Sequence, residues 1–100
     1  MHARKRIEIV VEAVQAERVT DLLDRLGAHG WTMLPVISGR GHNGLRLGGI
    51  PGGVFDNVLI LCIASADIAG RVVEAQAELL GARPAIVSIS DTEVLRGEHF

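Results

Sequence analysis

The residues best suited to chemistry lie in one glycine-rich run, Ser38-Gly39-Arg40-Gly41-His42-Asn43-Gly44. Glycine lets a backbone approach an anion closely, and successive N–H groups can form a concave nest for phosphate oxygens. Arg40 adds a planar guanidinium whose donors match phosphate geometry. The run lacks the Lys-Ser/Thr ending of a P-loop. From spacing alone, an anion site and a flexible solvent loop with merely solubilising arginines are therefore equally good interpretations.

No catalytic or metal-binding constellation is evident elsewhere. Cys62 is the only cysteine, which excludes an internal disulfide. It lies in an apolar run, where a small buried side chain is more common than a nucleophile. His42 lacks companions at the spacing that a zinc site needs. The sequence therefore predicts neither an enzyme nor a metal site.

The composition describes one ordered domain over residues 1–100. Hydrophobic residues make up 48% of the chain and charged residues 22%, a balance that argues against disorder. The net charge of −2 gives no overall attraction to nucleic acid or to an anionic membrane. We find no pattern typical of a secretory signal or of a membrane span. We expect a soluble cytoplasmic protein, with no nucleic acid bound and no membrane insertion.

The first part of the chain alternates between strand and helix patterns. In residues 7–12, Ile7, Ile9 and Val11 point one way and Glu8, Val10 and Glu12 point the other, as in a strand with one buried face. Apolar residues within 19–26 share one helical face, and Gly27 provides a C-cap. The start of this helix is not marked by a capping residue. Residues 31–38 predict a second strand, in which Pro35 requires an edge position or a bulge.

The second part begins with a glycine-rich segment. From Gly39 to Gly53, seven of fifteen residues are glycine, which predicts a long mobile loop over about 39–54. Residues 55–63 predict a strand that is apolar on both faces. A second helix is capped by Ser65 and closed by Gly81. Residues 85–89 predict a fourth strand, and a polar tail follows over about 91–100.

This order of elements predicts an α+β fold, a ferredoxin-like βαββαβ sandwich with the long glycine-rich loop between strands two and three. Two helices can cover only one face of the sheet. Val10 and the two-sided apolarity of residues 58–63 leave an apolar surface on the other face. We therefore expect that face to be buried by another subunit.

Over nearly its full length, the chain resembles the PII signal-transduction superfamily. The resemblance rests on the order of four segments: Ile7-Glu8-Ile9-Val10-Val11, Val19-Thr20-Asp21-Leu22-Leu23, Leu26-Gly27-Ala28-His29-Gly30-Trp31-Thr32 and Val36-Ile37-Ser38-Gly39-Arg40-Gly41. The last segment matches the start of the family's T-loop, the long segment that contacts partner proteins. The short form of the chain is similar to the PII-like branch linked to bicarbonate and carboxysomes.

The resemblance implies a homotrimer with an adenine nucleotide in each cleft between subunits. ADP and AMP are favoured over ATP, and cyclic AMP is a further candidate. In the family, residues after the first helix and at the end of the third strand contact the base. The T-loop base, the segment before the last strand and a basic C-terminal segment reach the phosphates. The implied nucleotide-binding residues are Gly30, Thr32, Ser38, Gly39, Arg40, Gly41, Leu61, Ile63, Arg83 and Arg96.

The chain departs from nitrogen-regulatory members at several positions. Lys5 is its only lysine, so the family's phosphate-binding lysine is missing and Arg83 is the candidate substitute. His42 stands near the position of the family's magnesium-associated glutamine, so sensing of ATP, magnesium and 2-oxoglutarate is not expected. A bicarbonate ion would suit Arg40, His42 or Arg46, by the same anion chemistry.

We therefore expect a regulatory signalling protein that binds adenine nucleotides and senses bicarbonate in inorganic-carbon metabolism. Its T-loop target would be a bicarbonate transporter or a carboxysome-related protein. Two alternatives stay open, an RNA-binding ferredoxin-like module and a structural trimer without a ligand. Trp31 is interpreted as a packed aromatic at the strand entry rather than as a platform for a base.

Overall fold

The computed structural model describes residues 1–41, 44–47, 57–81 and 85–100. In chain order the elements are β1 (His2–Glu12), η1 (Ala13–Gln15), α1 (Ala16–Arg25), β2 (Thr32–Pro35), β3 (Ser38–Gly41), β4 (Gly44–Leu47), β5 (Asn57–Ala64), α2 (Ala66–Glu74), α3 (Gln76–Leu80), β6 (Ala85–Val94) and η2 (Gly97–His99).

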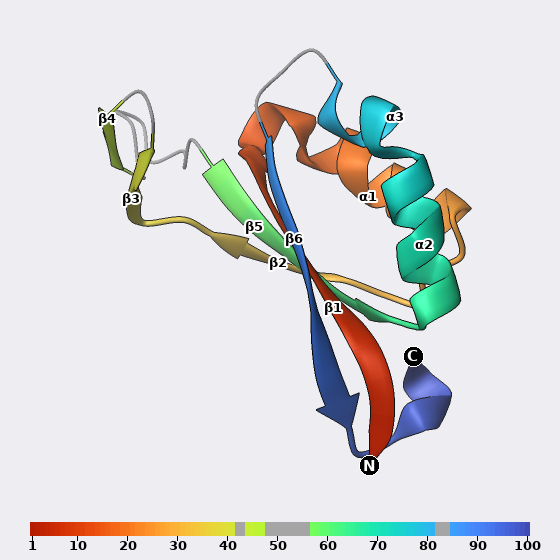
Figure 1. Ribbon diagram of the computed structural model, residues 1–100. Helices are drawn as coiled ribbons and strands as arrows, with labels where there is room; N and C mark the ends of the chain where they lie inside the picture. Colours follow the sequence, from red (N-terminus) through yellow and green to blue (C-terminus); the bar gives the residue numbers. More distant parts are fainter. Residues whose placement is uncertain (42–43, 48–56, 82–84) are drawn as a thin grey trace.

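Four strands form an antiparallel sheet in the order β2-β5-β1-β6. The helices α1, α2 and α3 all lie on one face of this sheet, and the hairpin of β3 and β4 projects from one end (Figure 1). This confirms the predicted ferredoxin-like α+β fold. No helix of the described residues is long and apolar enough to cross a membrane.

The core lies between the helices and the inner face of the sheet. Alternation along β1 buries Ile7, Ile9 and Val11, whereas their neighbours in the strand are only half-buried. Ile9 lies between Ile60 of β5 and Val87 of β6 in the strand register. Strand β5 adds Val58, Ile60, Cys62 and Ala64, and the helices contribute chiefly Val19, Leu22, Leu23, Val72 and Leu79.

The entry to α1 explains why the sequence marks no start for this helix. The 3-10 turn η1 passes directly from β1 into α1, and Gln15 at the N-cap makes no side-chain capping bond. Backbone hydrogen bonding through the turn replaces a side-chain cap, because the amide of Ala16 donates to the carbonyl of Ala13.

The second predicted strand, over residues 31–38, is shorter than expected. Pro35 ends β2, which is an edge strand as its missing N–H requires. The amide of Val36 still donates to Asn57 O at 3.0 Å, and the chain then leaves the sheet. Ser38 begins the hairpin, so part of the loop predicted over 39–54 is regular structure. Residues 42–43 and 48–56 lie outside the described part.

The second helix begins as predicted, because the Ser65 hydroxyl accepts a hydrogen bond from the amide of Ile68 at 3.2 Å. It is interrupted at Ala75, which separates α2 from α3. Strand β6 extends to Val94, five residues beyond the predicted end. The tail predicted from residue 91 is wrong in this respect, because β1 is long enough to pair His2 with Val94.

The outer face of the sheet carries no helix and holds a continuous apolar row. The register places Leu34, Leu59, Val10 and Ile86 side by side across all four strands. The outermost two are the most exposed of the row, with Leu34 at 42% and Ile86 at 66%. An apolar row that crosses a whole sheet is typical of a surface covered by another molecule.

Candidate functional site

The predicted base-binding residues come together on the outer face of the sheet. Thr32 of β2 is the direct register partner of Leu61 of β5. Ile63 lies two residues further along β5 and shares this face, because side chains alternate along a strand. Gly30 precedes β2 at the same edge of the sheet. These four residues form the base-side set.

Strand pairing places two further residues, Arg6 and Glu8, beside the base-side set. Neither was among the predicted site residues. Arg6 pairs with Ile63, and Glu8 pairs with Leu61. The Arg6 Nε donates to Glu8 Oε1 at 2.7 Å, so the two side chains form an ion pair beside the predicted base contacts. The alternating pattern of β1 indicates that both face outward, but only the register with β5 places them at the site.

Trp31 lies between Gly30 and Thr32 and is 40% exposed. Its indole N–H donates to Asp24 Oδ1 at 3.1 Å, which ties the entry of β2 to the last turn of α1. The prediction of a packed aromatic is therefore only partly met. Because Trp31 is the only tryptophan, its fluorescence reports on the base-side set.

The predicted phosphate-binding residues lie at the opposite end of the sheet. Ser38, Gly39 and Arg40 belong to β3, and Arg40 is exposed. Gly39 pairs with Arg46 of β4 in the backbone register. His42 and Arg83 lie outside the described residues.

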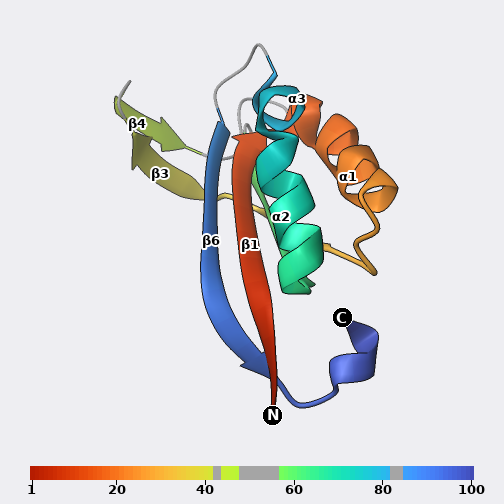
Figure 2. The same ribbon diagram turned by 45° about the vertical axis from the view of Figure 1, so that its right-hand side comes forward.

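Arg96 lies at the other end of β6, just before the turn η2. Its side chain is 72% exposed, and its Nε lies 3.5 Å from Glu98 Oε1. Arg4 of β1 holds the turn by donating to Gly97 O at 2.8 Å and to Phe100 O at 3.0 Å. Figure 2 shows this turn beside the start of β1, far from the hairpin.

One chain cannot bring all these residues to one nucleotide. The strand β6 runs from Ala85 to Val94, which is about 30 Å at the usual rise per residue. Arg96 follows this strand at its Val94 end, whereas the hairpin with Arg40 lies at the end of the sheet where β6 begins (Figure 1). This separation exceeds the length of a nucleoside diphosphate. A site that uses both ends must therefore combine residues from two copies.

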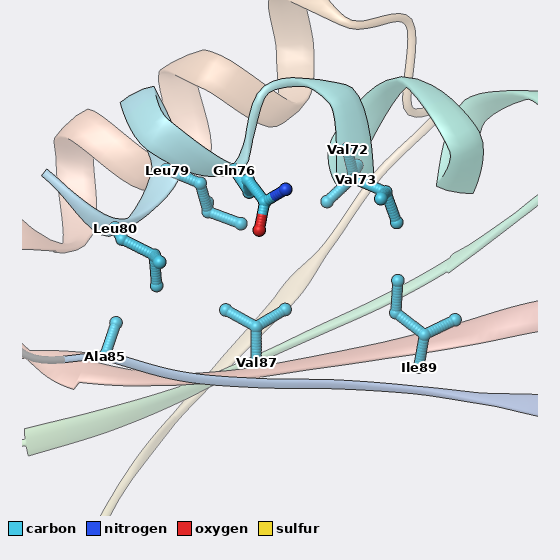
Figure 3. Close-up of a pocket in the computed structure, with 8 residues that line it drawn as sticks. All are labelled: Val72, Val73, Gln76, Leu79, Leu80, Ala85, Val87 and Ile89. Carbon is cyan, nitrogen blue, oxygen red and sulfur yellow. The ribbon is translucent and has the colours of Figure 1, made fainter.

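A groove of about 450 Å³ lies beside β6, between this strand and the helices α2 and α3 (Figure 3). None of the predicted site residues lines it. Its lining is almost entirely apolar, which suits protein contact rather than a phosphate. The lining residues are Val72, Val73, Gln76, Leu79, Leu80, Ala85, Val87 and Ile89.

A second hollow, near the start of β1, is polar, but its cations already have partners. Lys5 Nζ lies 2.5 Å from Asp91 Oδ1, and this contact lowers the pKa of the Asp91 carboxyl. Arg4 is engaged by the backbone of the C-terminal turn. Lys5 pairs with Ala64 and Asp91 in the strand register, at the end of the sheet away from the hairpin. It is therefore remote from the predicted phosphate residues of the hairpin.

Cys62 behaves as the sequence predicts. The side chain is buried in the core, and burial together with the nearby Asp24 carboxylate raises the pKa of its thiol. A raised pKa keeps the thiol protonated at neutral pH and unreactive. Among the residues that the structure describes, no cluster of three or more His, Cys, Asp or Glu side chains is arranged to hold a metal ion.

The antiparallel sheet with helices on one face and a projecting hairpin is the arrangement of PII-type ferredoxin-like domains. The family model of the nitrogen regulatory protein P-II matches residues 4–99, so the chain belongs to this family. This family consists of regulatory signalling proteins. No curated protein matches the sequence.

Solved structures place the chain within this family more closely. It is similar to CPII from Thiomonas intermedia K12, a PII-like protein bound to ADP, AMP and bicarbonate, with 28% identity, a TM-score of 0.87 and coverage of 99% of this chain and 94% of that one. The same protein bound to ADP, AMP and acetate gives 30% identity, a TM-score of 0.72 and coverage of 99% and 95%. The GlnK–ATP complex of B. subtilis is 18% identical, with a TM-score of 0.62 over 92% and 84% of the two chains, which supports the fold alone.

Proposed function

We propose that the chain is a non-enzymatic regulator that forms a homotrimer and binds ADP or AMP in the clefts between subunits. The likeness to CPII, which binds ADP and AMP, is the observation that carries this proposal. The base-side set of one subunit would hold adenine. Phosphates would lie between the hairpin base, with Ser38, Gly39, Arg40 and Gly41, and Arg96 of a neighbouring copy.

The outer face of the sheet supports the assembly. Burying the row of Leu34, Leu59, Val10 and Ile86 at the centre of a trimer removes apolar surface from water, which stabilises association. The groove beside β6 has the apolar character of a contact for the neighbouring subunit. These surfaces lie at opposite sides of the sheet, as a closed ring requires.

The cations of the chain favour ADP and AMP over ATP. A third phosphate adds negative charge that further cations must neutralise. The only lysine is held by Asp91 away from the hairpin, which leaves Arg40, Arg83 and Arg96 for phosphate. Cyclic AMP, with a single charged phosphate, is compatible with the same set.

A small planar anion is a further ligand in this proposal. CPII is found with bicarbonate and with acetate, both of which present a carboxylate-type face to a guanidinium. In this chain Arg40, His42 and Arg46 would provide the donors. A bicarbonate response would place the protein in inorganic-carbon metabolism in the cytoplasm. The T-loop would then bind a partner protein, either a bicarbonate transporter or a carboxysome-related protein.

Two other functions are less well supported. An RNA-binding domain of this fold stacks bases on aromatic side chains of the open sheet face. Here the described row on that face is aliphatic, with no aromatic member. A structural trimer without a ligand would use the same apolar row but would not need the arginines at the two ends of β6.

Calorimetry and Trp31 fluorescence test the proposal. The protein is titrated with adenosine, AMP, ADP, ATP and cyclic AMP, each with and without bicarbonate, and sedimentation gives the oligomeric state. We expect a trimer, saturable binding with ADP or AMP tighter than ATP, and a change in Trp31 emission. A monomer, or no heat and no emission change with any nucleotide, contradicts the proposal. A gel shift with mixed RNA sequences tests the RNA alternative.

A further inference from the structure

The chain leaves α1 at Gly27 and α3 at Gly81, and we call these two positions the helix exits. Both share an unusual backbone conformation. Gly27 follows α1 with a φ of 99°, and Gly81 follows α3 with a φ of 58°. No other residue of the described ranges has a positive φ. Gly27 leads to Gly30 and Thr32 on the base side, whereas Gly81 leads toward Arg83 and β6.

An arginine from the opposite helix reaches each of these exits. Arg18 of α1 donates to Glu78 O at 2.5 Å and to Leu79 O at 3.0 Å, in the last turn of α3. Arg71 of α2 donates to Leu26 O at 3.3 Å, at the C-cap of α1. Each guanidinium thus satisfies carbonyls that a helix end leaves unpaired, and it lies at the negative end of the helix dipole.

Both arginines also lie against the glycine that follows. A Cβ added at Gly81 would lie 3.1 Å from Arg18 Nη2, and one added at Gly27 would lie 3.6 Å from Arg71 Nη1. Arg18 is itself fixed by Gln15 Oε1 at 3.0 Å, and Arg71 by Asp67 Oδ2 at 3.0 Å. The positions of the two guanidinium groups are therefore set by their own helices as well as by the exits.

We propose that Arg18 and Arg71 are positioning residues for the two halves of the nucleotide site. Arg71 fixes the exit on the base side, and Arg18 fixes the exit on the phosphate side. This inference rests on the proposed function. Neither arginine touches the nucleotide, and each acts through the backbone that it caps.

The chain offers a matched control for Arg18. Arg25 also joins α1 to α3, but it does so through an ion pair with the Glu78 side chain and not through a backbone carbonyl. Arg25→Met therefore removes a link between the same two helices without releasing the exit. Asp67→Asn is the corresponding control for Arg71, because it removes the ion pair and leaves the bond to Leu26 O available.

The first measurement is amide hydrogen exchange of the free protein. We expect Arg18→Met to speed exchange at Gly81 and Ala85 while leaving Gly27 and Ala28 as in the wild type. Arg71→Met is expected to have the reverse pattern. The same exchange pattern in Arg25→Met as in Arg18→Met, or loss of protection throughout the core, would overturn the assignment.

The second measurement is the affinity for adenosine, AMP and ADP. Arg18→Met should weaken ADP about fivefold while changing adenosine by less than about twofold, because the backbone that leads to the phosphate side loses the hydrogen bonds that fix it. Arg71→Met should weaken all three ligands by a similar factor. A purely structural role would lower thermal stability without this difference between ligands.

Outcomes for the two proposals are distinguishable. If the wild type binds no adenine nucleotide, the proposed function fails, and the positioning role in a nucleotide site fails with it; the exchange maps then decide whether the arginines hold the exits at all. If the wild type binds ADP and both variants lose all ligands equally, only the positioning proposal fails. If Arg18→Met does not fold, Arg18→Lys replaces it in both measurements. Lysine keeps the charge but cannot hold both carbonyls, so we expect the same changes in exchange and in ADP affinity at a smaller size.

Discussion

Arg40 and Arg96 have different structural settings, although both are proposed to bind phosphate. Arg40 is exposed on β3, beyond the point where the chain leaves the main sheet. Arg96 follows β6 and lies near Glu98, in a turn that Arg4 ties to β1. A bound phosphate would have to compete with Glu98 for the Arg96 guanidinium.

Replacing either arginine by alanine should therefore act on the phosphates and not on the base. We expect Arg40→Ala and Arg96→Ala each to weaken ADP about tenfold or more, the usual effect of losing a charge-assisted contact. Adenosine affinity should stay within about twofold of the wild type. Calorimetry with both ligands measures the difference, and Arg25→Ala, remote from the proposed ligands, is the control. Unchanged ADP affinity in both variants would remove these arginines from the site.

Cys62 gives a second test at the scale of one residue. Because burial and Asp24 raise the pKa of its thiol, the folded protein holds the thiol proton more tightly than the unfolded chain does. The stability that this provides is complete below the thiol pKa of the unfolded chain and is lost as pH rises through the folded value. At about pH 8, iodoacetamide should modify the native protein far more slowly than the protein unfolded in guanidinium. Equal rates would show that the thiol is accessible.

At the scale of elements, Ser65 illustrates how a local signal determines an end of a helix. Its hydroxyl accepts the Ile68 amide at the start of α2, and Asp67 adds negative charge in the first turn. Ser65→Ala should lower the free energy of unfolding by about 1 kcal/mol. Ser65→Asp or Ser65→Asn should restore most of it, because both side chains can accept the same bond. Equal stability of the alanine and wild-type proteins in urea denaturation would contradict this role for the cap.

Elements with a repeating pattern or a local cap could be predicted from the sequence. The alternation of Ile7, Ile9 and Val11, the cap at Ser65 and the edge position of Pro35 all follow from side-chain chemistry within a few residues. The length of β6 could not be predicted in this way. Its second half is polar and exposed, and it is a strand because β1 provides a backbone partner as far as His2.

The same distinction applies to the candidate site. The glycine-rich run on both sides of Arg40 can be recognised in the sequence, because glycine permits backbone conformations and close approaches to a ligand that other residues do not. Arg6 beside Ile63 is not visible, since their proximity exists only through the register of β1 with β5. The separation of Arg40 from Arg96 likewise depends on the lengths of the paired strands.

For the molecule as a whole, the outer face of the sheet is the main feature that a monomer leaves unexplained, because no helix covers its apolar row. Ile86→Glu would place a charge within the proposed trimer contact, and a buried unpaired charge is strongly unfavourable. We expect this variant to dissociate to folded monomers in sedimentation experiments and to lose ADP binding. Val14→Glu, at a side chain that is also exposed but lies on η1 outside the sheet, should remain trimeric. A trimer of normal stability in Ile86→Glu would show that this face is not the contact.

In the proposed assembly each nucleotide site combines two subunits, which mixed trimers can test. Protomers with Arg40→Ala and protomers with Arg96→Ala are differently tagged, co-expressed and purified as mixed assemblies. ADP is then titrated at concentrations that neither variant binds alone. If Arg40 and Arg96 come from neighbouring subunits, one of the three clefts in each mixed trimer contains both arginines, so about a third of the clefts bind ADP with wild-type affinity. If one subunit supplies both arginines, no cleft is restored, and the absence of any wild-type binding in the mixture would contradict the claim.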